Sequence, residues 1–466
     1  MSRFIDREKE LKILKERYFS NKPEFIVIYG KRRVGKTEII EKFLSSSEVE
    51  GIRLLAREES KIIQLRRFKQ VLYEKFGDSL LEKIEFKNWD AFFEYLSTKC
   101  ENRRIVIAID EFPYLVKEDR SLPSTLQDYW DRKLRKTKIF LIICGSSISM
   151  MEKLIGYKSP LYGRRTAQML IRPFKFLNVF DYVKNFEKAV EFYSVFGGTP
   201  AYLMEIDKNR DIITNIRSKI LREDVFIYRD VEFLLREEVR EPRYYFSILL
   251  SISKGNNRIG LICNDTGLSK NIVSKYLSVL MELHLVRRII PITESFKSKK
   301  GLYFISDNLF DFWFRFVYPN IDKIERDEID LIINHEIKPY LNQFIGKKFE
   351  SVCEEIIPKL NFFDFTKLGK WWHKDKEIDI VAINENTKKI LFGECKWRNK
   401  VNAEKICKEL SEKSSYIRWY NKERKESFAI FAKDFSNRIE EFEERKVYCF
   451  DLKDMEKEIK KRNQFS

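Results

Sequence analysis

The first 150 residues alternate short apolar runs with longer charged segments of helical periodicity. The apolar runs are rich in β-branched residues and end in turn or polar residues, as buried parallel strands joined by helices do. The predicted strands are residues 25–30, 52–56, 105–110 and 139–145. This pattern predicts an α/β domain whose ligands bind beyond the carboxyl ends of the strands.

The pattern changes after the predicted sheet. Long helical periodicity predicts a small helical subdomain, and the next segment reads as three helices followed by a β-hairpin, the order of a winged helix-turn-helix. A helical connector then leads to a last segment in which helices flank the strands EIDIVAI and ILFGECKW. The expected fold class is therefore multidomain α/β, with a parallel sheet first and a mixed α/β domain last. The predicted domains are 1–180, 181–235, 236–306, 307–340 and 341–466.

Charge and composition narrow the class of partner. The 466 residues include 89 Lys plus Arg against 72 Asp plus Glu, a net charge of +17. This excess favours an anionic partner such as DNA, although a solvated basic surface is the alternative. The seven cysteines have no zinc-type spacing, which indicates reduced thiols in the cytoplasm. No run of about 18 apolar residues occurs, so we expect no membrane association.

A phosphate-binding loop follows the first predicted strand. The motif GxxxxGK[ST] is matched without deviation by Gly30, Lys31, Arg32, Arg33, Val34, Gly35, Lys36 and Thr37. In such a loop, backbone N–H groups surround the β-phosphate, the lysine bridges the β- and γ-phosphates, and the threonine ligates Mg²⁺. The loop predicts ATP and Mg²⁺ as ligands, with Lys36 and Thr37 in those two roles.

Three further polar residues follow predicted strands. Asp110 ends the strand at 105–110 and is the expected second Mg²⁺ contact, and Glu111 is the candidate general base for the attacking water. Ser146 follows the strand at 139–145 and can hydrogen-bond the γ-phosphate or the water. The alternative role for Ser146 is to cap the helix that follows it.

Six motifs in order carry a family resemblance over about residues 1–235. They are FIDREKEL, the phosphate loop, IAIDEFPYL, IICGSSISMME, SPLYGRRT and FGGTPAYL. Together they resemble the archaeal ATPase family within the AAA+/STAND group of P-loop proteins. The resemblance implies a sheet with a helical lid, an adenine pocket near Phe4 to Glu8, and a γ-phosphate-sensing arginine. Either Arg164 or Arg165 fits that last role, within one subunit or across an interface, and the alternative is a structural role for both.

The predicted winged helix is basic. Residues 269–300 contain two acids and seven cations, at positions 270, 275, 287, 288, 297, 299 and 300. This balance suits contacts with duplex phosphates, and the segment Ser269-Lys270-Asn271 can reach base edges. The alternative is an intramolecular clamp or a module that binds protein.

Charged residues on the two strands of the last segment suggest a metal site. Glu394 and Lys396 share a strand face, and a neighbouring strand can bring Asp379 beside them. Two carboxylates that hold Mg²⁺ and a lysine that orients water form the D…ExK arrangement of metal-dependent nucleases. Glu350, on a preceding helix, is a further candidate ligand.

The stretch 340–450 also resembles the C-terminal domain attached to archaeal ATPases, which is similar to the PD-(D/E)xK nuclease fold. The proline that often precedes the aspartate is replaced by Ile378. An active nuclease, an inactive nuclease fold and a strand with fortuitous charges all fit this pattern.

These features predict a Mg²⁺-dependent ATPase coupled to DNA binding or cleavage by its C-terminal domains. The rival hypothesis is an ATP-driven regulatory switch whose nuclease-like domain is an inactive platform for protein or DNA. The sequence leaves open whether the chain forms a homo-oligomer or binds a protein partner.

Overall fold

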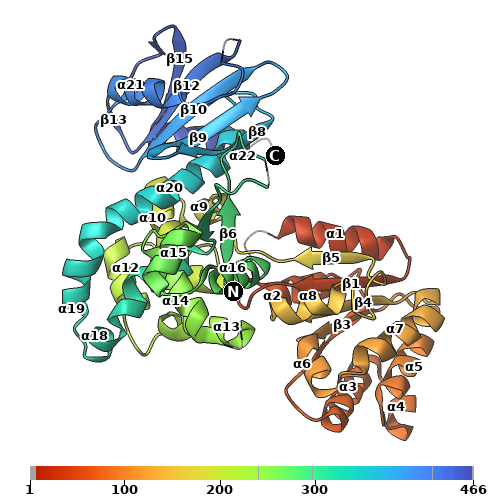
Figure 1. Cartoon of the computed structure of the whole chain (residues 1–466). Coiled ribbons are helices and arrows are strands. Elements are labelled where there is room, and N and C mark those ends of the chain that lie inside the picture. Colours follow the sequence, from red (N-terminus) through yellow and green to blue (C-terminus); the bar gives the residue numbers. More distant parts are fainter. Residues whose placement is uncertain (1–6, 240, 296, 422, 464–466) are drawn as a thin grey trace. The chain divides into compact units, whose positions relative to one another are not determined.

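The computed structural model describes residues 7–463, apart from 240, 296 and 422. The chain divides into two compact units, Met1–Pro173 and Phe174–Ser466 (Figure 1). The first contains the predicted phosphate loop. The predicted lid, winged helix, connector and last domain fall in the second, and the boundaries among them remain predictions.

The first unit is built on a five-stranded parallel sheet with the order β2-β3-β4-β1-β5. Its strands are β1 (Glu24–Tyr29), β2 (Gly51–Leu55), β3 (Val106–Asp110), β4 (Phe140–Gly145) and β5 (Ala167–Leu170). Four were predicted, and the short edge strand β5 was not. Because β4 lies between β1 and β3, the loops that follow these three strands meet at one edge of the sheet.

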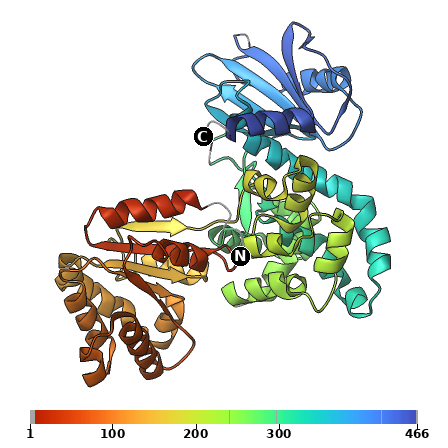
Figure 2. The same ribbon diagram turned by 180° about the vertical axis from the view of Figure 1, so that it is seen from behind.

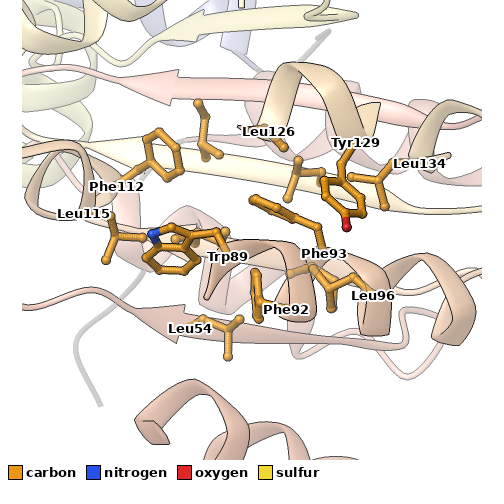
Figure 3. Packing of buried hydrophobic residues seen from close by; sticks show 14 of the residues in the cluster. Leu54, Trp89, Phe92, Phe93, Leu96, Phe112, Leu115, Leu126, Tyr129 and Leu134 are labelled. Atoms are coloured by element: carbon orange, nitrogen blue, oxygen red, sulfur yellow. The ribbon is translucent and has the colours of Figure 1, made fainter. Parts of the chain in front are cut away.

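Helices cover both faces of this sheet. They are α1 (Glu8–Phe19), α2 (Lys36–Leu44), α3 (Lys61–Phe76), α4 (Leu80–Lys83), α5 (Trp89–Lys99), α6 (Phe112–Glu118), α7 (Leu122–Arg132) and α8 (Ile148–Ile155), with a 3-10 turn at Leu134–Lys136. Alternating strand residues enter two hydrophobic cores. Figure 3 shows the larger core, where the aromatic rings of Trp89, Phe92 and Phe93 pack between Leu54 and Tyr129. This packing holds the strand ends in fixed positions.

The second unit begins with helices. They are α9 (Phe176–Val183), α10 (Phe186–Phe196), α11 (Pro200–Glu205), α12 (Ile212–Lys219), α13 (Phe226–Glu238), α14 (Pro242–Ser253), α15 (Ile259–Thr266) and α16 (Lys270–Glu282). The antiparallel pair β6 (Val286–Ile289) and β7 (Leu302–Ile305) follows α16. Helices α14 to α16 and this hairpin have the order that the sequence predicted, and we call residues 242–305 the winged-helix segment.

A run of helices connects the hairpin to the last domain. It comprises α17 (Asn308–Phe312), a π-helical turn (Trp313–Val317), a 3-10 turn (Tyr318–Asn320), α18 (Ile321–Glu325), α19 (Ile329–Leu331), a second π-helical turn (Ile332–Ile337) and α20 (Lys338–Leu360). Figure 2 shows α22 (Leu452–Asn463) beside the long helix α20.

A six-stranded mixed sheet lies between α20 and α22 in the sequence, with the order β14-β15-β12-β10-β9-β8. Its strands are β8 (Lys367–His373), β9 (Lys376–Asn384), β10 (Lys389–Lys396), β12 (Lys425–Ala432), β14 (Glu441–Phe442) and β15 (Arg445–Phe450). Helix α21 (Ala403–Ser414) follows β11 (Val401–Asn402), which forms a separate parallel pair with β13 (Phe435–Asn437). Strands β8, β9 and β10 are antiparallel neighbours, whereas β10, β12 and β15 run parallel. The predicted fold class, a parallel-sheet unit with a separate mixed α/β domain, is confirmed.

Among the described residues, no helix combines the length and the apolar character that crossing a membrane requires.

Candidate functional site

The loop between β1 and α2 has a backbone that requires glycine at two positions. Gly30 has φ 154°, and a Cβ there would lie 2.2 Å from the Ile171 carbonyl oxygen. Gly35 has φ 91° and precedes the first turn of α2. Arg33 also has a positive φ, 67°, and Val34 is fully buried. The predicted phosphate loop therefore has a close turn that leads directly into a helix N-terminus.

Lys36 is held inside this loop. Its Nζ donates to the carbonyl oxygens of Gly30 and Lys31, both at 3.0 Å, and the residue is only 5% exposed. Burial lowers the pKa of Lys36, while the nearby acids Glu111 and Asp110 oppose that shift. The neighbouring Arg32 donates to the hydroxyl of Tyr114 at 2.9 Å. The ammonium group of Lys36 is thus fixed where the loop would surround a phosphate.

Thr37 and Asp110 lie together at the edge of the sheet. The Thr37 hydroxyl donates to Asp110 Oδ2 at 2.9 Å, and Asp110 is only 2% exposed. A hydroxyl and a carboxylate in contact form a pair of oxygen ligands that Mg²⁺ prefers. Arg53 on β2 also contacts Asp110 Oδ2, at 3.2 Å, and it pairs with Glu41 at 2.8 Å. Sequence reasoning missed Arg53, because only the β2–β3 pairing brings it beside Asp110.

Glu111 is oriented by Ser146. It has a left-handed φ of 55°, and its Oε2 accepts hydrogen bonds from the Ser146 hydroxyl at 2.9 Å and from the Ser146 N–H at 3.3 Å. The cap of α8 is Ser147, whose side chain accepts from Met150 N. The structure therefore gives Ser146 a carboxylate partner, and its expected contact with phosphate or water remains a prediction.

The two candidate arginines have different partners. Arg164 forms an ion pair with Asp131 at 3.1 Å, whereas Arg165 donates to the Ile155 carbonyl at 2.8 Å. The γ-phosphate-sensing role stays a prediction for both.

The adenine pocket was expected near Phe4 to Glu8, and Phe4 lies outside the described residues. At the described end of this segment, Arg7 donates to the Val34 carbonyl at 2.8 Å and so contacts the phosphate loop.

The second candidate site lies in the last domain, where three carboxylates converge. One carboxylate oxygen of each of Glu350, Glu377 and Asp379 lies within 4.8 Å of the other two, an arrangement that suits a metal ion. Asp379 Oδ2 accepts the Cys395 N–H at 2.9 Å, just beyond the last β9–β10 pair. Burial, together with the charges of Glu350 and Glu394, raises the pKa of Asp379 well above its ordinary value.

The sequence predicted Glu350, Asp379 and Glu394 as the metal ligands. The structure groups Glu350 and Asp379 with a different third acid. Glu394 is only 4% exposed and is held by two lysines, Lys396 at 2.6 Å and Lys413 at 3.2 Å. Glu377 takes its place in the cluster. Glu377 and Asp379 are two residues apart on β9, so the alternation of side chains along a strand places them on one face. This spacing in the sequence was a sufficient signal for Glu377.

A second lysine, missed in the sequence, also belongs to this cluster. Lys370 on β8 forms an ion pair with Glu350 and is buried. Burial opposes its positive charge, but Glu350 and Asp379 hold the pKa of Lys370 above its ordinary value. Burial likewise opposes the charge of Lys396, whose pKa is raised by Glu394. Each lysine therefore remains a cation beside a carboxylate.

A cavity of about 210 Å³ adjoins the carboxylate cluster. Glu350, Glu377 and Lys370 line one side of it, and Arg287 and Ile289 of β6 line another. Arg287 also donates to the Ser351 hydroxyl at 3.1 Å. The winged-helix segment and the last domain therefore share this cavity.

The fold and the phosphate loop define a P-loop ATPase, and comparisons with known proteins agree. A family model described as an ATPase domain predominantly from Archaea matches residues 4–206. A second, described as archaeal and bacterial proteins of unknown function, matches residues 313–406. An uncharacterised protein of Methanocaldococcus jannaschii is 39% identical over 463 residues, which are 97% of this chain and 99% of that protein. The chain belongs to this archaeal family of P-loop ATPases, and it is an ATP-binding ATPase.

Solved structures support the fold alone. A Walker-type ATPase of Pyrococcus abyssi aligns with a TM-score of 0.50 and 21% identity, over 67% of this chain and 96% of that chain.

Proposed function

We propose that this ATPase hydrolyses ATP with Mg²⁺ in its first unit and cleaves DNA with a divalent metal ion in its last domain. The observation that carries the second activity is the convergence of Glu350, Glu377 and Asp379 within 4.8 Å. Lys370 forms an ion pair with Glu350 of this cluster, and Lys396 forms one with the neighbouring Glu394. Carboxylates that hold a metal ion, next to ammonium groups that stabilise charge on a phosphate, suit phosphodiester hydrolysis.

Each residue of the first site has a role in ATP hydrolysis that follows from its position. Lys36 and the loop N–H groups bind the phosphates, and Thr37 and Asp110 would hold Mg²⁺, which would neutralise charge on the transferred phosphoryl group. Glu111 polarises the attacking water, and Ser146 keeps the Glu111 carboxylate in one orientation.

In the last domain, the three clustered acids would hold the metal ion, which would supply activation of the attacking water. Lys370 offsets the mutual repulsion of the acids because it lies against Glu350. Lys396 carries the positive charge that the D…ExK pattern places near the phosphate.

One observation favours the alternative, a regulatory switch with a domain that does not cleave. Glu394, an expected metal ligand, is occupied by Lys396 and Lys413. Under this alternative, the last domain binds DNA or protein without cleavage while the first unit still hydrolyses ATP.

The deciding experiment incubates the full-length protein with plasmid, linear duplex and single-stranded DNA in Mg²⁺ or Mn²⁺, with and without ATP. Phosphate release is measured in the same samples. Asp379→Ala, Glu377→Gln and Lys396→Ala should abolish cleavage and leave ATP hydrolysis unchanged, whereas Lys36→Ala should stop ATP hydrolysis. Glu354→Gln, one helical turn from Glu350, is the matched control. Intact DNA in every sample, with ATP still consumed, would establish the switch instead.

A further inference from the structure

An open groove lies between the winged-helix segment and the last domain. Its volume is about 1440 Å³, and both parts of the second unit line it. The winged-helix segment contributes α15, the turn from α15 to the start of α16, and the hairpin with its tip. The last domain contributes Trp372, His373 and Lys374, which end β8 and begin the turn to β9.

The groove is strongly basic. Its lining contains seven Lys or Arg side chains, namely Arg258, Lys270, Arg288, Lys297, Lys299, Lys300 and Lys374. No Asp or Glu is among the described residues that line it. Four of these cations form no ion pair with any described side chain, so their ammonium groups are available to a ligand. They are Lys270, Lys297, Lys299 and Lys374. A hollow lined by unneutralised cations attracts a polyanion.

The two walls of the groove are joined by contacts. The backbone N–H of Ile292 donates to the Lys370 carbonyl at 2.8 Å, and Trp372 Nε1 donates to the Lys300 carbonyl at 3.2 Å. Ile292 also packs against the hydrophobic core of the last domain. Because the hairpin is anchored to β8, Lys270 and Lys374 belong to one continuous surface.

The aromatic residues of the groove indicate which form of nucleic acid it takes. Proteins that bind single strands stack bases on exposed rings. Trp372 and Tyr303 line the groove, but they are only 6% and 8% exposed, and the Trp372 indole N–H is already bonded. His373 lines the groove and is exposed, but neither the Trp ring nor the Tyr ring of the groove is. Flexible lysines without exposed Trp or Tyr rings suit the phosphates of a duplex.

We propose that this groove binds the phosphate backbone of double-stranded DNA, and that Lys374 of the last domain contacts the same duplex as Lys270 of the winged-helix segment. This inference rests on the proposed action on DNA and adds a binding surface distinct from the carboxylate cluster. Adjacent residues of β6 separate the two sites, since Arg287 lines the carboxylate cavity and Arg288 lines the groove.

The test measures fluorescence anisotropy of a labelled 20-base-pair duplex with the full-length protein in EDTA, so that no metal-dependent cleavage occurs. Lys270→Gln and Lys374→Asn neutralise one charge on each wall, and Asn suits the left-handed φ of 54° at Lys374. Each variant should weaken binding several-fold and reduce the slope of log Kd against log salt by about 1, because each phosphate contact releases about 0.9 counterion. The double variant should reduce the slope by about 2.

Lys388→Asn is the matched control. Lys388 shares the left-handed φ of 54° and lies in the turn at the other end of β9, outside the groove. It should bind DNA as the unmodified protein does. Lys374→Gly should reproduce the Lys374→Asn result, which separates lost charge from altered packing. Thermal unfolding confirms that each variant is folded.

Unchanged affinity and salt slope in both Lys374 variants would overturn the proposal, as would tighter binding of single-stranded DNA or duplex RNA. Asp379→Ala should bind the duplex normally. If the protein binds the duplex through the groove but does not cleave it, the proposed nuclease activity fails and the proposed groove stands. If the protein cleaves DNA but the groove variants bind it normally, the nuclease activity stands and the proposed groove fails.

Discussion

The hydroxyl of Ser146 at the end of β4 donates a 2.9 Å hydrogen bond to Glu111 at the end of β3. Glu111 has a left-handed backbone, and the Ser146 N–H also reaches its carboxylate. Parallel pairing of β3 and β4 brings the two residues together. A carboxylate fixed in this way is oriented before ATP arrives.

Removing this hydrogen bond should slow hydrolysis without weakening ATP binding. Ser146→Ala should lower kcat by about tenfold and leave KM unchanged, because a displaced general base loses part of its usual contribution. Steady-state phosphate release measures this split. Ser147→Ala is the control; it removes the cap of α8 and should cost about 1 kcal/mol of stability with kcat retained. A rise in KM alone would place Ser146 in ATP binding instead.

Arg53 should compete with Mg²⁺ for Asp110. Its guanidinium lies 3.2 Å from the same Asp110 oxygen that accepts the Thr37 hydroxyl. A partly exposed ion pair is worth about 1 kcal/mol, so Arg53→Ala should lower the Mg²⁺ concentration for half-maximal ATPase activity by about fivefold. Magnesium titration of ATP hydrolysis tests this. Lys61→Ala, which removes the pair with Asp119, should leave the titration unchanged. A weaker Mg²⁺ response in Arg53→Ala would show that Arg53 supports the site.

Lys370 should stabilise the carboxylate cluster in the absence of metal. Lys370→Met leaves the half-buried Glu350 without its buried partner, and breaking such a pair costs about 3 kcal/mol. Urea unfolding in EDTA measures the loss, which Mn²⁺ should partly restore because a bound cation stabilises the folded state. The double variant Lys370→Met/Glu350→Gln should be less destabilised than Lys370→Met.

Lys367→Met, an exposed position on the same strand, is the control and should change stability by less than about 0.5 kcal/mol. Equal destabilisation of the single and double Lys370 variants would show that the pair with Glu350 is not the cause.

The cluster should bind divalent metal more tightly as the pH rises. The pKa of Asp379 in the folded protein is raised by burial and by Glu350 and Glu394, so its proton must leave before a cation binds. The raised pKa of Asp379 also makes the stability of the folded protein depend on pH. The folded state keeps a proton that the unfolded chain loses, so without metal the stability contribution is full below the ordinary Asp pKa and is lost as the pH rises through the raised pKa.

Titration calorimetry with Mn²⁺ and thermal unfolding in EDTA, each over a pH series, measure these two trends. Asp379→Asn should flatten the stability trend, and Asp375→Asn in the adjoining turn controls for the loss of one carboxylate. Metal affinity that is constant with pH would contradict the assignment of Asp379 as a ligand.

The sequence by itself determined the phosphate loop and the class of the chain. Residues 30–37 are consecutive, so their chemistry and their position between a strand and a helix are encoded locally. The buried strands that end at Asp110 and Gly145 were predicted for the same reason, since continuous apolar runs mark parallel strands.

The tertiary structure alone decided which distant side chains meet. Arg53 joins Asp110 through the β2–β3 pairing, and Glu377 on β9 meets Glu350 because helix α20 packs against that strand. The basic groove likewise exists only because the hairpin is anchored to β8, which brings Lys374 to the cations of the winged-helix segment. Such contacts depend on register and packing between elements, and these have no periodic signature along one chain.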